Sequence, residues 1–310
     1  MKGKKTNGEQ YIEEAIDNGA SVIVCSKTFK IKQKILTIKT NKVRHLLSEI
    51  SSRFYNSKPT NIIAVTGTNG KTSVADNFYQ ILRANNIPVA SIGTFGIKYN
   101  DKIIKTDLTS PDTVSIHKHL YFLKKKNINN VIIEASSHGL DQKRLHHINF
   151  KAGIFTNFSQ DHLDYHKNMK SYLKSKLVLF REILRKKTLV ISDKEIEPYK
   201  IIKEISKKRN LKLLDINDEF SEKNYAPLEI KDFKTKNLLM AIEATKLCGL
   251  KEKLILKSIK KLKEINGRLE LVKKFPNNIK VFIDYAHTPD ALLKTLKYLK
   301  YKYRNNISLV

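Results

Sequence analysis

The sequence predicts an α/β fold built on a central parallel sheet, with smaller α/β units flanking it on both sides. Three observations support this prediction. From residue 61 onward, short apolar runs of strand length alternate with longer amphipathic stretches of helix length, as in parallel sheets that helices cover on both faces. A Gly-rich segment at 66–73 joins the first of these runs to the next helix. Other polar clusters also follow apolar runs directly, at the strand ends where parallel sheets bind ligands.

The first sixty residues predict a small α/β unit and a connecting helix. Residues 9–24 predict a helix followed by a strand, because apolar residues recur at helical spacing before the run at 22–24. Residues 43–55 predict a second helix with one apolar face, and Pro59 closes the connector after it.

The central part predicts alternating strands and helices. The expected strands are 62–65, 131–134, 152–156, 188–191 and 211–214, and the expected helices are 73–85, 113–125, 169–185 and 235–247. A Lys-rich helix at 251–264 leads to a boundary, a new strand follows at 280–283, and residues 307–310 predict a further strand.

Composition bounds the class of protein. A length of 310 residues predicts two or three domains, and a hydrophobic content of 41% is typical of globular packing. No apolar run approaches the roughly 20 residues that cross a bilayer, and no apolar core follows the basic start at 1–5, so we expect no membrane association and no secretory signal. Cys25 and Cys248 lie far apart and form no metal-ligand spacing, which favours a cytoplasmic location.

The net charge of +29 arises from 59 basic and 30 acidic residues. A basic chain suggests nucleic acid or an anionic surface as a partner. However, the lysines are spread along the whole chain, which a general compositional bias explains equally well. We therefore expect no nucleic-acid partner, and we note that phosphorylated substrates would suit a basic surface.

The segment 66–73, Thr-Gly-Thr-Asn-Gly-Lys-Thr-Ser, predicts a phosphate-binding loop because it stands between a strand and a helix. Gly67 and Gly70 let backbone N–H groups turn onto phosphate oxygens, and the helix N-terminus adds partial positive charge. Lys71 is placed to reach the outer phosphates and Thr72 to ligate Mg²⁺. The common form of this loop has an earlier glycine, at the position that Val65 occupies here.

Two further polar clusters follow strands. Glu134 ends the strand at 131–134 and precedes the run Ala-Ser-Ser-His-Gly, so it is placed to bind a hard cation, although a helix cap is the structural alternative. The segment 161–166, Asp-His-Leu-Asp-Tyr-His, follows the strand that ends at residue 156. Its density of carboxylates and imidazoles suits metal binding, phosphate binding or acid–base chemistry.

Three other residues are candidates on weaker grounds. Lys176 lies near the apolar face of the helix at 169–185, where snorkelling to solvent is the common explanation. Arg268, in Asn-Gly-Arg-Leu-Glu, and Asp284, in Asp-Tyr-Ala-His-Thr-Pro-Asp, could clamp phosphate and ribose from a second domain.

Together these motifs resemble the Mur ligase family of peptidoglycan synthesis over essentially the whole chain, and most of all its UDP-N-acetylmuramoyl-tripeptide synthetases. The tight Thr-Gly-Thr-Asn-Gly-Lys-Thr loop is the variant of this family. The runs at 134–144, 161–166 and 284–290 are similar to segments of the tripeptide synthetases. The resemblance implies ATP-dependent addition of the third amino acid to UDP-N-acetylmuramoyl-L-alanyl-D-glutamate through an acyl phosphate, with Mg²⁺ as a cofactor.

The resemblance also implies roles for individual residues. Lys71, Lys176 and His162 correspond to catalytic positions, and Lys176 to a lysine that the family carbamylates. The implied metal ligands are Thr72, Glu134, His162 and carbamylated Lys176. The implied nucleotide contacts are Gly67, Thr68, Asn69, Gly70, Lys71, Thr72, Ser73, Asn237, Arg268 and Asp284. The implied contacts to the muramoyl-peptide are Thr109, Ser110, Ser136, Gln142 and Arg144.

The resemblance further implies an incomplete chain. We expect a remnant of a uridine-nucleotide-binding domain at 1–44, a central ATP-binding domain at 45–264 and the start of a ligase domain at 265–310, in a monomeric protein. The incoming amino acid is left open, with meso-diaminopimelate favoured and L-lysine as the alternative. Folylpolyglutamate synthetase, and an inactive protein that binds a nucleotide or RNA, are the other interpretations.

Overall fold

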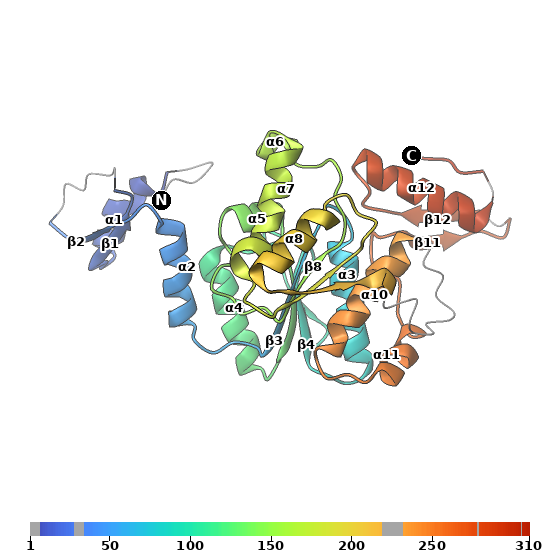
Figure 1. Ribbon diagram of the computed structural model, residues 1–310, viewed down its shortest axis with the longest axis horizontal. Coiled ribbons are helices and arrows are strands. Elements are labelled where there is room, and N and C mark those ends of the chain that lie inside the picture. Colours follow the sequence, from blue (N-terminus) through green and yellow to red (C-terminus); the bar gives the residue numbers. More distant parts are fainter. Residues whose placement is uncertain (1–6, 28–33, 219–231, 278, 305) are drawn as a thin grey trace.

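The structure is a computed structural model that describes residues 7–27, 34–218, 232–277, 279–304 and 306–310. An eight-stranded sheet lies at its centre, in the order β10-β9-β8-β3-β7-β4-β5-β6 (Figure 1). The strands are β3 (Asn61–Thr66), β4 (Val89–Gly93), β5 (Gly96–Tyr99), β6 (Lys102–Ile104), β7 (Asn130–Glu134), β8 (Ala152–Phe155), β9 (Leu189–Ser192) and β10 (Lys212–Asp215).

The sheet is mostly parallel, which confirms the predicted fold class. The six strands from β10 to β4 pair in parallel, and β5 and β6 add an antiparallel extension. β3 lies between β7 and β8, so the loop after β3 emerges in the middle of the carboxyl edge. β4, β5 and β6 were not predicted, because these strands are short and their residues mix polar with apolar types.

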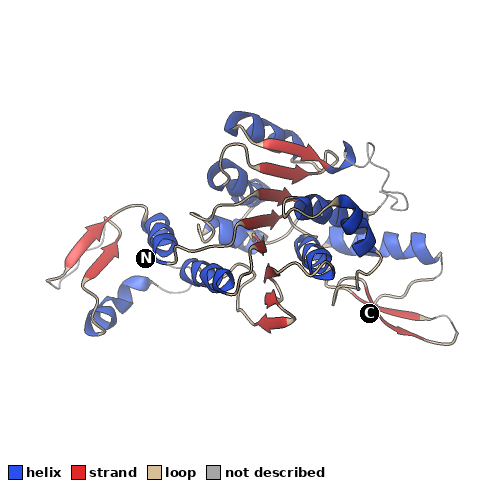
Figure 2. Ribbon diagram, turned by 90° about the horizontal axis from the view of Figure 1, so that it is seen from below, coloured by secondary structure: helices blue, strands red, loops and turns tan. Residues whose placement is uncertain are grey.

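Helices cover both faces of the sheet, as the edge-on view in Figure 2 shows. α3 (Lys71–Ala84), α10 (Phe233–Lys246) and α11 (Glu252–Ile259) cover one face. α4 (Thr113–Lys125), α7 (Met169–Val178), a π-helical turn at Leu179–Ile183 and α8 (Tyr199–Arg209) cover the other. Successive residues of β3 point to opposite faces, so Ile62 and Ala64 join one core and Ile63 and Val65 the other.

Side-chain caps fix where several helices begin. Asp112 accepts hydrogen bonds from the amides of Val114 and Ser115 at the start of α4. Asn168 caps α7 and Asp232 caps α10 in the same way. Such caps stabilise a helix by roughly 0.5–2 kcal/mol relative to alanine. The cap of α7 therefore helps to set the position of the side chains that this helix presents to the loop after β3.

The N-terminal unit lies beside the helix-covered central sheet (Figure 1). It contains a 3-10 turn at Gly8–Tyr11, α1 (Ile12–Asp17) and the parallel strands β1 (Val22–Cys25) and β2 (Leu36–Lys39). α2 (Val43–Phe54) then packs against α4. The helices and the strand predicted in this region are confirmed, whereas the boundary between 44 and 45 stays a prediction.

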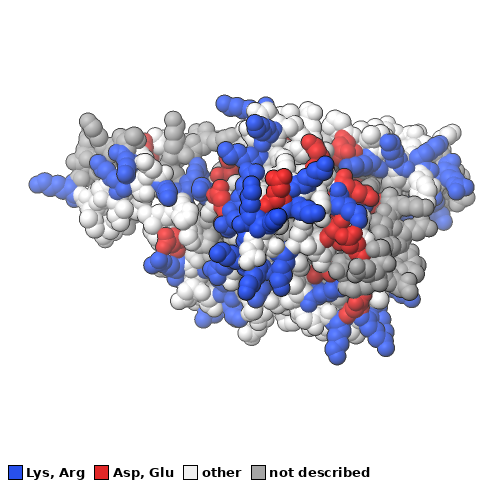
Figure 3. Space-filling view, viewed as in Figure 1, with Lys and Arg blue, Asp and Glu red and all other residues white. Residues whose placement is uncertain are grey.

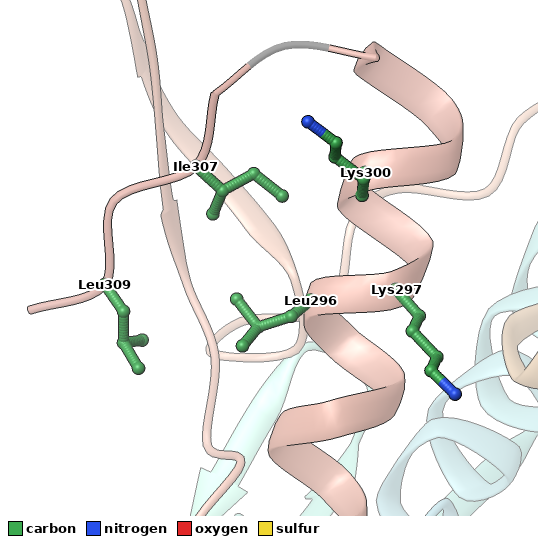
Figure 4. A pocket seen from close by; sticks show the side chains of 5 residues that line it. All are labelled: Leu296, Lys297, Lys300, Ile307 and Leu309. Carbon is green, nitrogen blue, oxygen red and sulfur yellow. The ribbon is translucent and has the colours of Figure 1, made fainter.

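The C-terminal unit holds an antiparallel pair, β11 (Glu270–Lys274) and β12 (Lys280–Ile283), and then α12 (Pro289–Tyr303). The strand predicted at 307–310 is wrong: residues 306–310 have no regular secondary structure. Ile307 and Leu309 instead lie beside Leu296 of α12, around a shallow apolar hollow (Figure 4). Apolar side chains can be partly covered in this way without the ladder of hydrogen bonds that a strand needs.

Two other boundaries differ from the prediction. The helix expected at 169–185 is α-helical only to Val178 and continues as the π-helical turn. The helix expected at 251–264 ends at Ile259. Short helices complete the described part near the site, namely α5 (Ser137–Asp141) and α6 (Leu163–His166). Among the described residues, no helix is long and apolar enough to cross a membrane.

Charged side chains are distributed widely over the face that Figure 3 shows. Lys and Arg extend from the N-terminal unit across the central sheet to the C-terminal unit, with Asp and Glu between them. On this face the basic side chains are thus spread over the whole length of the molecule rather than gathered at one end.

Candidate functional site

The loop between β3 and α3 has the geometry of a phosphate-binding loop. Gly67 has a φ of 143° and Gly70 a φ of 83°, values that favour glycine. Space is equally restrictive, because a Cβ on Gly67 would lie 1.9 Å from Thr156 Oγ1 and one on Gly70 would lie 2.5 Å from Asn237 Oδ1. Both glycines are therefore required by backbone conformation and by close neighbours.

Residues that follow β8 hold this loop in place. The Thr156 hydroxyl donates to the Asn69 carbonyl at 2.6 Å, and the Asn69 amide donates to the Asn157 side chain at 2.8 Å. The Thr68 amide donates to the Asn157 carbonyl at 3.0 Å. The loop conformation is thus set by a neighbouring strand end, which is a preorganised arrangement for binding an anion.

Lys71 is the first residue of α3 and its ammonium lies over the loop. Nζ donates to the carbonyl oxygens of Gly67, at 3.0 Å, and Thr68, at 2.7 Å. Burial lowers the pKa of Lys71, while the charges of Glu134 and Asp161 act in the opposite direction. Lys71 therefore places a positive charge at the loop, within the field of two carboxylates.

Glu134, at the end of β7, is buried and fully hydrogen-bonded. Its carboxylate accepts from the Thr72 hydroxyl at 3.0 Å, from the Thr94 hydroxyl at 3.1 Å and from the Thr94 amide at 3.0 Å. Gly93 leaves room for it, since a Cβ there would lie 2.0 Å from Glu134 Oε1. The side chain is therefore not a helix cap; it joins the loop to the end of β4.

The oxygen donors around Glu134 suit a hard cation. A carboxylate and two hydroxyls meet there, beside a small hollow that Thr72, Asp76 and Glu134 help to line. Mg²⁺ prefers oxygen ligands and is commonly bound by one or two carboxylates together with substrate phosphates. The chemistry of this donor set fits Mg²⁺ bound beside a nucleotide.

Lys176 is fully buried rather than snorkelling, with 1% of its surface exposed. Its Nζ donates to the Gly67 carbonyl at 2.7 Å and lies 4.4 Å from the centre of the Tyr172 ring. Lys176 and Lys71 thus share one acceptor. Burial, with a further contribution from the charge of Lys71, holds the pKa of Lys176 well below its usual range. This environment favours the neutral amine, which is the nucleophilic form.

His162 lies near Lys176, whose charge it senses, and is more exposed. It precedes α6 in the left-handed conformation, with a φ of 51°. Its Nε2 is 3.4 Å from Asp161 Oδ2. Partial burial lowers the pKa of His162, Asp161 opposes this effect, and the charges of Lys176 and Lys71 add to it. The predicted metal ligands therefore form two neighbouring groups. Thr72 and Glu134 make up one group, and His162 and Lys176 the other. The charge of Lys71 interacts with both Glu134 and His162.

Four of the five predicted muramoyl-peptide contacts form one hydrogen-bonded group next to Glu134. The Ser110 hydroxyl donates to the Glu134 carbonyl at 2.7 Å and lies 3.0 Å from the Ser136 hydroxyl. The Arg144 guanidinium donates to the Ser110 carbonyl at 2.7 Å and to the Gln142 side chain at 2.8 Å. Thr109, directly before Ser110, is partly exposed.

The predicted nucleotide contacts outside the loop come from separate parts of the chain. Asn237, on α10, is buried against Gly70. The Arg268 guanidinium donates to the Thr72 hydroxyl at 3.2 Å, so the C-terminal unit reaches the loop. Asp284 accepts from the amides of Leu269, at 2.6 Å, and Ala286, at 2.7 Å. Its carboxylate thereby joins the segments that precede β11 and follow β12. Ser73, in the first turn of α3, is partly exposed.

Sequence reasoning missed Thr94 and gave no role to His287. Thr94 follows β4, which was not predicted, although the run Val-Ala-Ser-Ile-Gly before it could have indicated a strand end. His287 Nε2 lies 3.9 Å from Asp161 Oδ2 and so brings the C-terminal unit to the second group.

The fold and the site together define an α/β protein with a phosphate-binding loop at the carboxyl edge of its central sheet. Residues 65–254 match the Mur ligase middle domain, and the chain belongs to the Mur ligase family.

Relatives of known name support this assignment. The chain is 36% identical to the UDP-N-acetylmuramoyl-L-alanyl-D-glutamate–2,6-diaminopimelate ligase of Rickettsia bellii, over 95% of this chain and 66% of the relative. It is 35% identical to the enzyme of the same name from Wigglesworthia glossinidia brevipalpis, over 99% and 68%. The chain therefore spans about two thirds of the length of the curated relatives that it matches.

Solved structures support the fold alone. A structure of a UDP-N-acetylmuramoyl-L-alanyl-D-glutamate–2,6-diaminopimelate ligase superposes with a TM-score of 0.76 at 24% identity, covering 94% of this chain and 64% of the other. A bifunctional folylpolyglutamate synthase/dihydrofolate synthase superposes with a TM-score of 0.63 at 16% identity, covering 82% and 70%.

Proposed function

We propose that the chain is the nucleotide-binding part of a ligase that joins a diamino acid to UDP-N-acetylmuramoyl-L-alanyl-D-glutamate, coupled to cleavage of ATP. The observation that carries this proposal is the convergence of Lys71, Thr72 and Glu134 at the carboxyl edge of the sheet, in a member of the Mur ligase family. Diaminopimelate is favoured over L-lysine because it stands in the names of the curated relatives.

ATP would bind with its phosphates on the loop from Gly67 to Ser73. Backbone amides and the N-terminus of α3 would contact the phosphate oxygens, and Lys71 would exchange its carbonyl partners for the outer phosphates. Asn237, Arg268 and Asp284 would contact the rest of the nucleotide. Because Arg268 already reaches Thr72, it is placed to add positive charge beside the transferred phosphoryl group.

Thr72 and Glu134 would hold Mg²⁺ beside the phosphates, and His162 and Lys176 would complete a second metal position. The metal would supply charge neutralisation as the phosphoryl group transfers. Glu134 needs little rearrangement for this role, since the amide of Thr94 already fixes its Oε1.

The reaction would proceed in two steps. A substrate carboxylate oxygen would attack the γ-phosphorus of ATP, and the bond between this phosphorus and the oxygen that bridges to the β-phosphate would break. ADP would depart, and the substrate would become an acyl phosphate. The amine of the diamino acid then attacks the acyl carbon, loses a proton, and expels inorganic phosphate to form the amide. Thr109, Ser110, Ser136, Gln142 and Arg144 would position the muramoyl-peptide, and alignment of this kind supplies much of the rate in phosphoryl transfer.

Lys176 would act in a carbamylated form. Its neutral amine attacks the carbon of CO₂ and releases one proton, giving an anionic carbamate. The modification would exchange a buried group that favours the neutral state for one that accepts hydrogen bonds and binds a cation. The shared acceptor with Lys71 supports this, because an anion at Lys176 would pair with the Lys71 ammonium rather than compete with it.

Other parts of the assignment follow from the same proposal. The proposed partners are the UDP-linked dipeptide, a diamino acid and ATP, with no nucleic acid or membrane. Such substrates would place the protein in the cytoplasm, and we propose that it works as a monomer. The proposed domains are a remnant of a uridine-nucleotide-binding domain at 1–44, an ATP-binding domain at 45–264 and the start of a ligase domain at 265–310.

The proposal is tested with the protein as its gene encodes it. Binding of a non-hydrolysable ATP analogue is measured by calorimetry with Mg²⁺, and phosphate release is then followed with the UDP-linked dipeptide and meso-diaminopimelate. Parallel reactions contain L-lysine, or a folate with L-glutamate. We expect analogue binding and phosphate release only with the UDP-linked dipeptide. Release only with the folate would favour the folylpolyglutamate interpretation, and failure to bind the analogue would refute the proposal.

A further inference from the structure

A second cluster of ligating side chains lies away from the nucleotide site, where α2 meets the loop after α5. His45 and Glu49 come from α2, and His147 comes from the loop. One donor atom from each of the three lies within 4.8 Å of the others. The rings of His45 and His147 meet edge to face, with their centres 4.6 Å apart. We propose that these three side chains form a zinc site.

The positions on α2 suit a metal ion. His45 and Glu49 are four residues apart on one helix, so their side chains project from the same face. Helices that bind zinc commonly supply two ligands at this spacing. Both side chains are partly exposed and His147 is exposed, so an ion can enter from solvent.

The loop that carries His147 is fixed against the same helix. The Ser48 hydroxyl donates to the His146 carbonyl at 2.7 Å, and the Ser52 hydroxyl donates to the His147 carbonyl at 3.1 Å. These bonds come from the turn between the helix ligands and the turn after it. The third ligand is therefore held beside the first two without a metal, which lowers the entropy lost on binding.

The donor set selects the metal. Two imidazole nitrogens and one carboxylate oxygen suit Zn²⁺, which takes them at about 2.0–2.2 Å and leaves one position for water. Mg²⁺ and Ca²⁺ prefer oxygen donors throughout. A tetrahedral ion places its ligands about 3.4 Å apart, so rotation of partly exposed side chains has to shorten separations of up to 4.8 Å.

Arg53 competes with a metal for Glu49. Its guanidinium lies 2.7 Å from Glu49 Oε1, and its side chain is 80% exposed. Exposed ion pairs of this kind are weak, so zinc would displace Arg53. The neighbouring His146 also packs edge to face against His45, with ring centres 5.8 Å apart, but its Nε2 faces Glu182 Oε2 at 3.4 Å.

A zinc ion here would link α2 to the loop that carries His147. α2 connects the N-terminal unit to the central sheet, and the loop with His147 continues the segment that carries Gln142 and Arg144. Zinc would thus tie the N-terminal connection to the segment proposed to bind the muramoyl-peptide. The site does not depend on the ligase assignment.

Calorimetric titration of Zn²⁺ into the metal-free 310-residue chain tests the proposal. We expect one ion per chain, and binding at least about 10-fold weaker in His45→Ala and His147→Ala. Arg53→Ala should bind zinc more tightly, because Glu49 is released. His119→Ala, a partly exposed histidine on α4, is the matched control and should bind as the parent does. Amide exchange at 143–149 should slow when zinc binds.

Conservative variants separate the loss of a zinc ligand from a loss of folding. His45→Gln and Glu49→Gln repeat the test with little change in volume, and circular dichroism establishes that each variant is folded. Zinc binding that is unchanged in these variants would overturn the proposal. Loss of binding in His162→Ala instead would place the ion in the nucleotide site and would also overturn it. Failure of the parent chain to bind Zn²⁺ at millimolar concentration would also overturn it.

Discussion

Replacing Lys176 with methionine should stabilise the fold at neutral pH even though it removes a residue proposed to be essential for activity. Methionine has a similar length and no charge, so it fills the same volume. The parent side chain is 1% exposed and shares the Gly67 carbonyl with Lys71. The variant loses one hydrogen bond, worth about 1 kcal/mol net, but the carbonyl keeps its bond from Lys71. The variant also avoids a cost of folding, because the parent amine must either lose its proton or be buried as a charged group when the chain folds.

The pH dependence gives the magnitude. Burial holds the folded-state pKa of Lys176 well below its usual range, whereas the unfolded chain has the ordinary lysine pKa of about 10.4. Between these two values the unfolded state binds more protons, so the free energy of unfolding of the parent rises with pH. One proton corresponds to about 1.4 kcal/mol per pH unit. The advantage of Lys176→Met should therefore be greatest at pH values below the folded-state pKa of Lys176, and should shrink by up to that amount per pH unit as the pH rises toward 10.4.

Urea unfolding of both proteins at several pH values, in buffers freed of CO₂, measures this difference. Exclusion of CO₂ matters because carbamylation would remove the amine that titrates. Lys71 is present in both proteins, so its own titration largely cancels. A stability difference that does not change with pH, or a variant less stable than the parent at pH 7, would refute the idea that Lys176 is held neutral by burial.

Three further changes test the site. Lys71→Ala should weaken ATP binding in the Mg²⁺ complex by about 1.5–3 kcal/mol, the contribution of a hydrogen bond to a charged group, while circular dichroism stays unchanged. Calorimetry that detects no loss would remove Lys71 from the site. Glu134→Gln should instead raise the Mg²⁺ concentration needed for nucleotide binding, and an identical Mg²⁺ titration curve would exclude it as a ligand. Gly67→Ala should lower the free energy of unfolding by about 1–3 kcal/mol through backbone strain, and by a further amount because its Cβ would collide with Thr156. Gly249→Ala, with a φ of 82° and open space around it, should lose only the strain contribution. Equal losses of the two variants in urea unfolding would contradict the predicted collision at Gly67.

Local sequence patterns determined the core of the fold. The strand at 61–66, the loop with Gly67 and Gly70 and the helix after it were predicted from an apolar run, two glycines and a Lys-Thr pair, because each of these features constrains the backbone of its own neighbourhood. The short strands β4, β5 and β6 were not predicted. β4 pairs with the distant β7, whereas β5 and β6 follow it in successive antiparallel hairpins. Strands of three to five residues carry too little periodicity to be recognised in a sequence.

The candidate site divides in the same way. The identities of Lys71, Thr72 and Glu134 followed from their positions after strands, because the carboxyl ends of parallel strands meet at one edge. The partners of these residues did not follow. Thr94 beside Glu134, and Asn237 against Gly70, are brought there by elements 40 and 167 positions away in the chain.

By itself, the sequence determined the class of fold, the phosphate-binding loop and the strand ends on which the chemistry lies, because these depend on backbone preferences over a few neighbouring residues. Tertiary structure alone decided that Lys176 is buried against Gly67 instead of reaching solvent, that Arg268 comes to Thr72 from the C-terminal unit, and that His147 meets His45. The physical reason is that burial, electrostatic coupling and ligand geometry arise from the packing of distant segments, which no local pattern encodes.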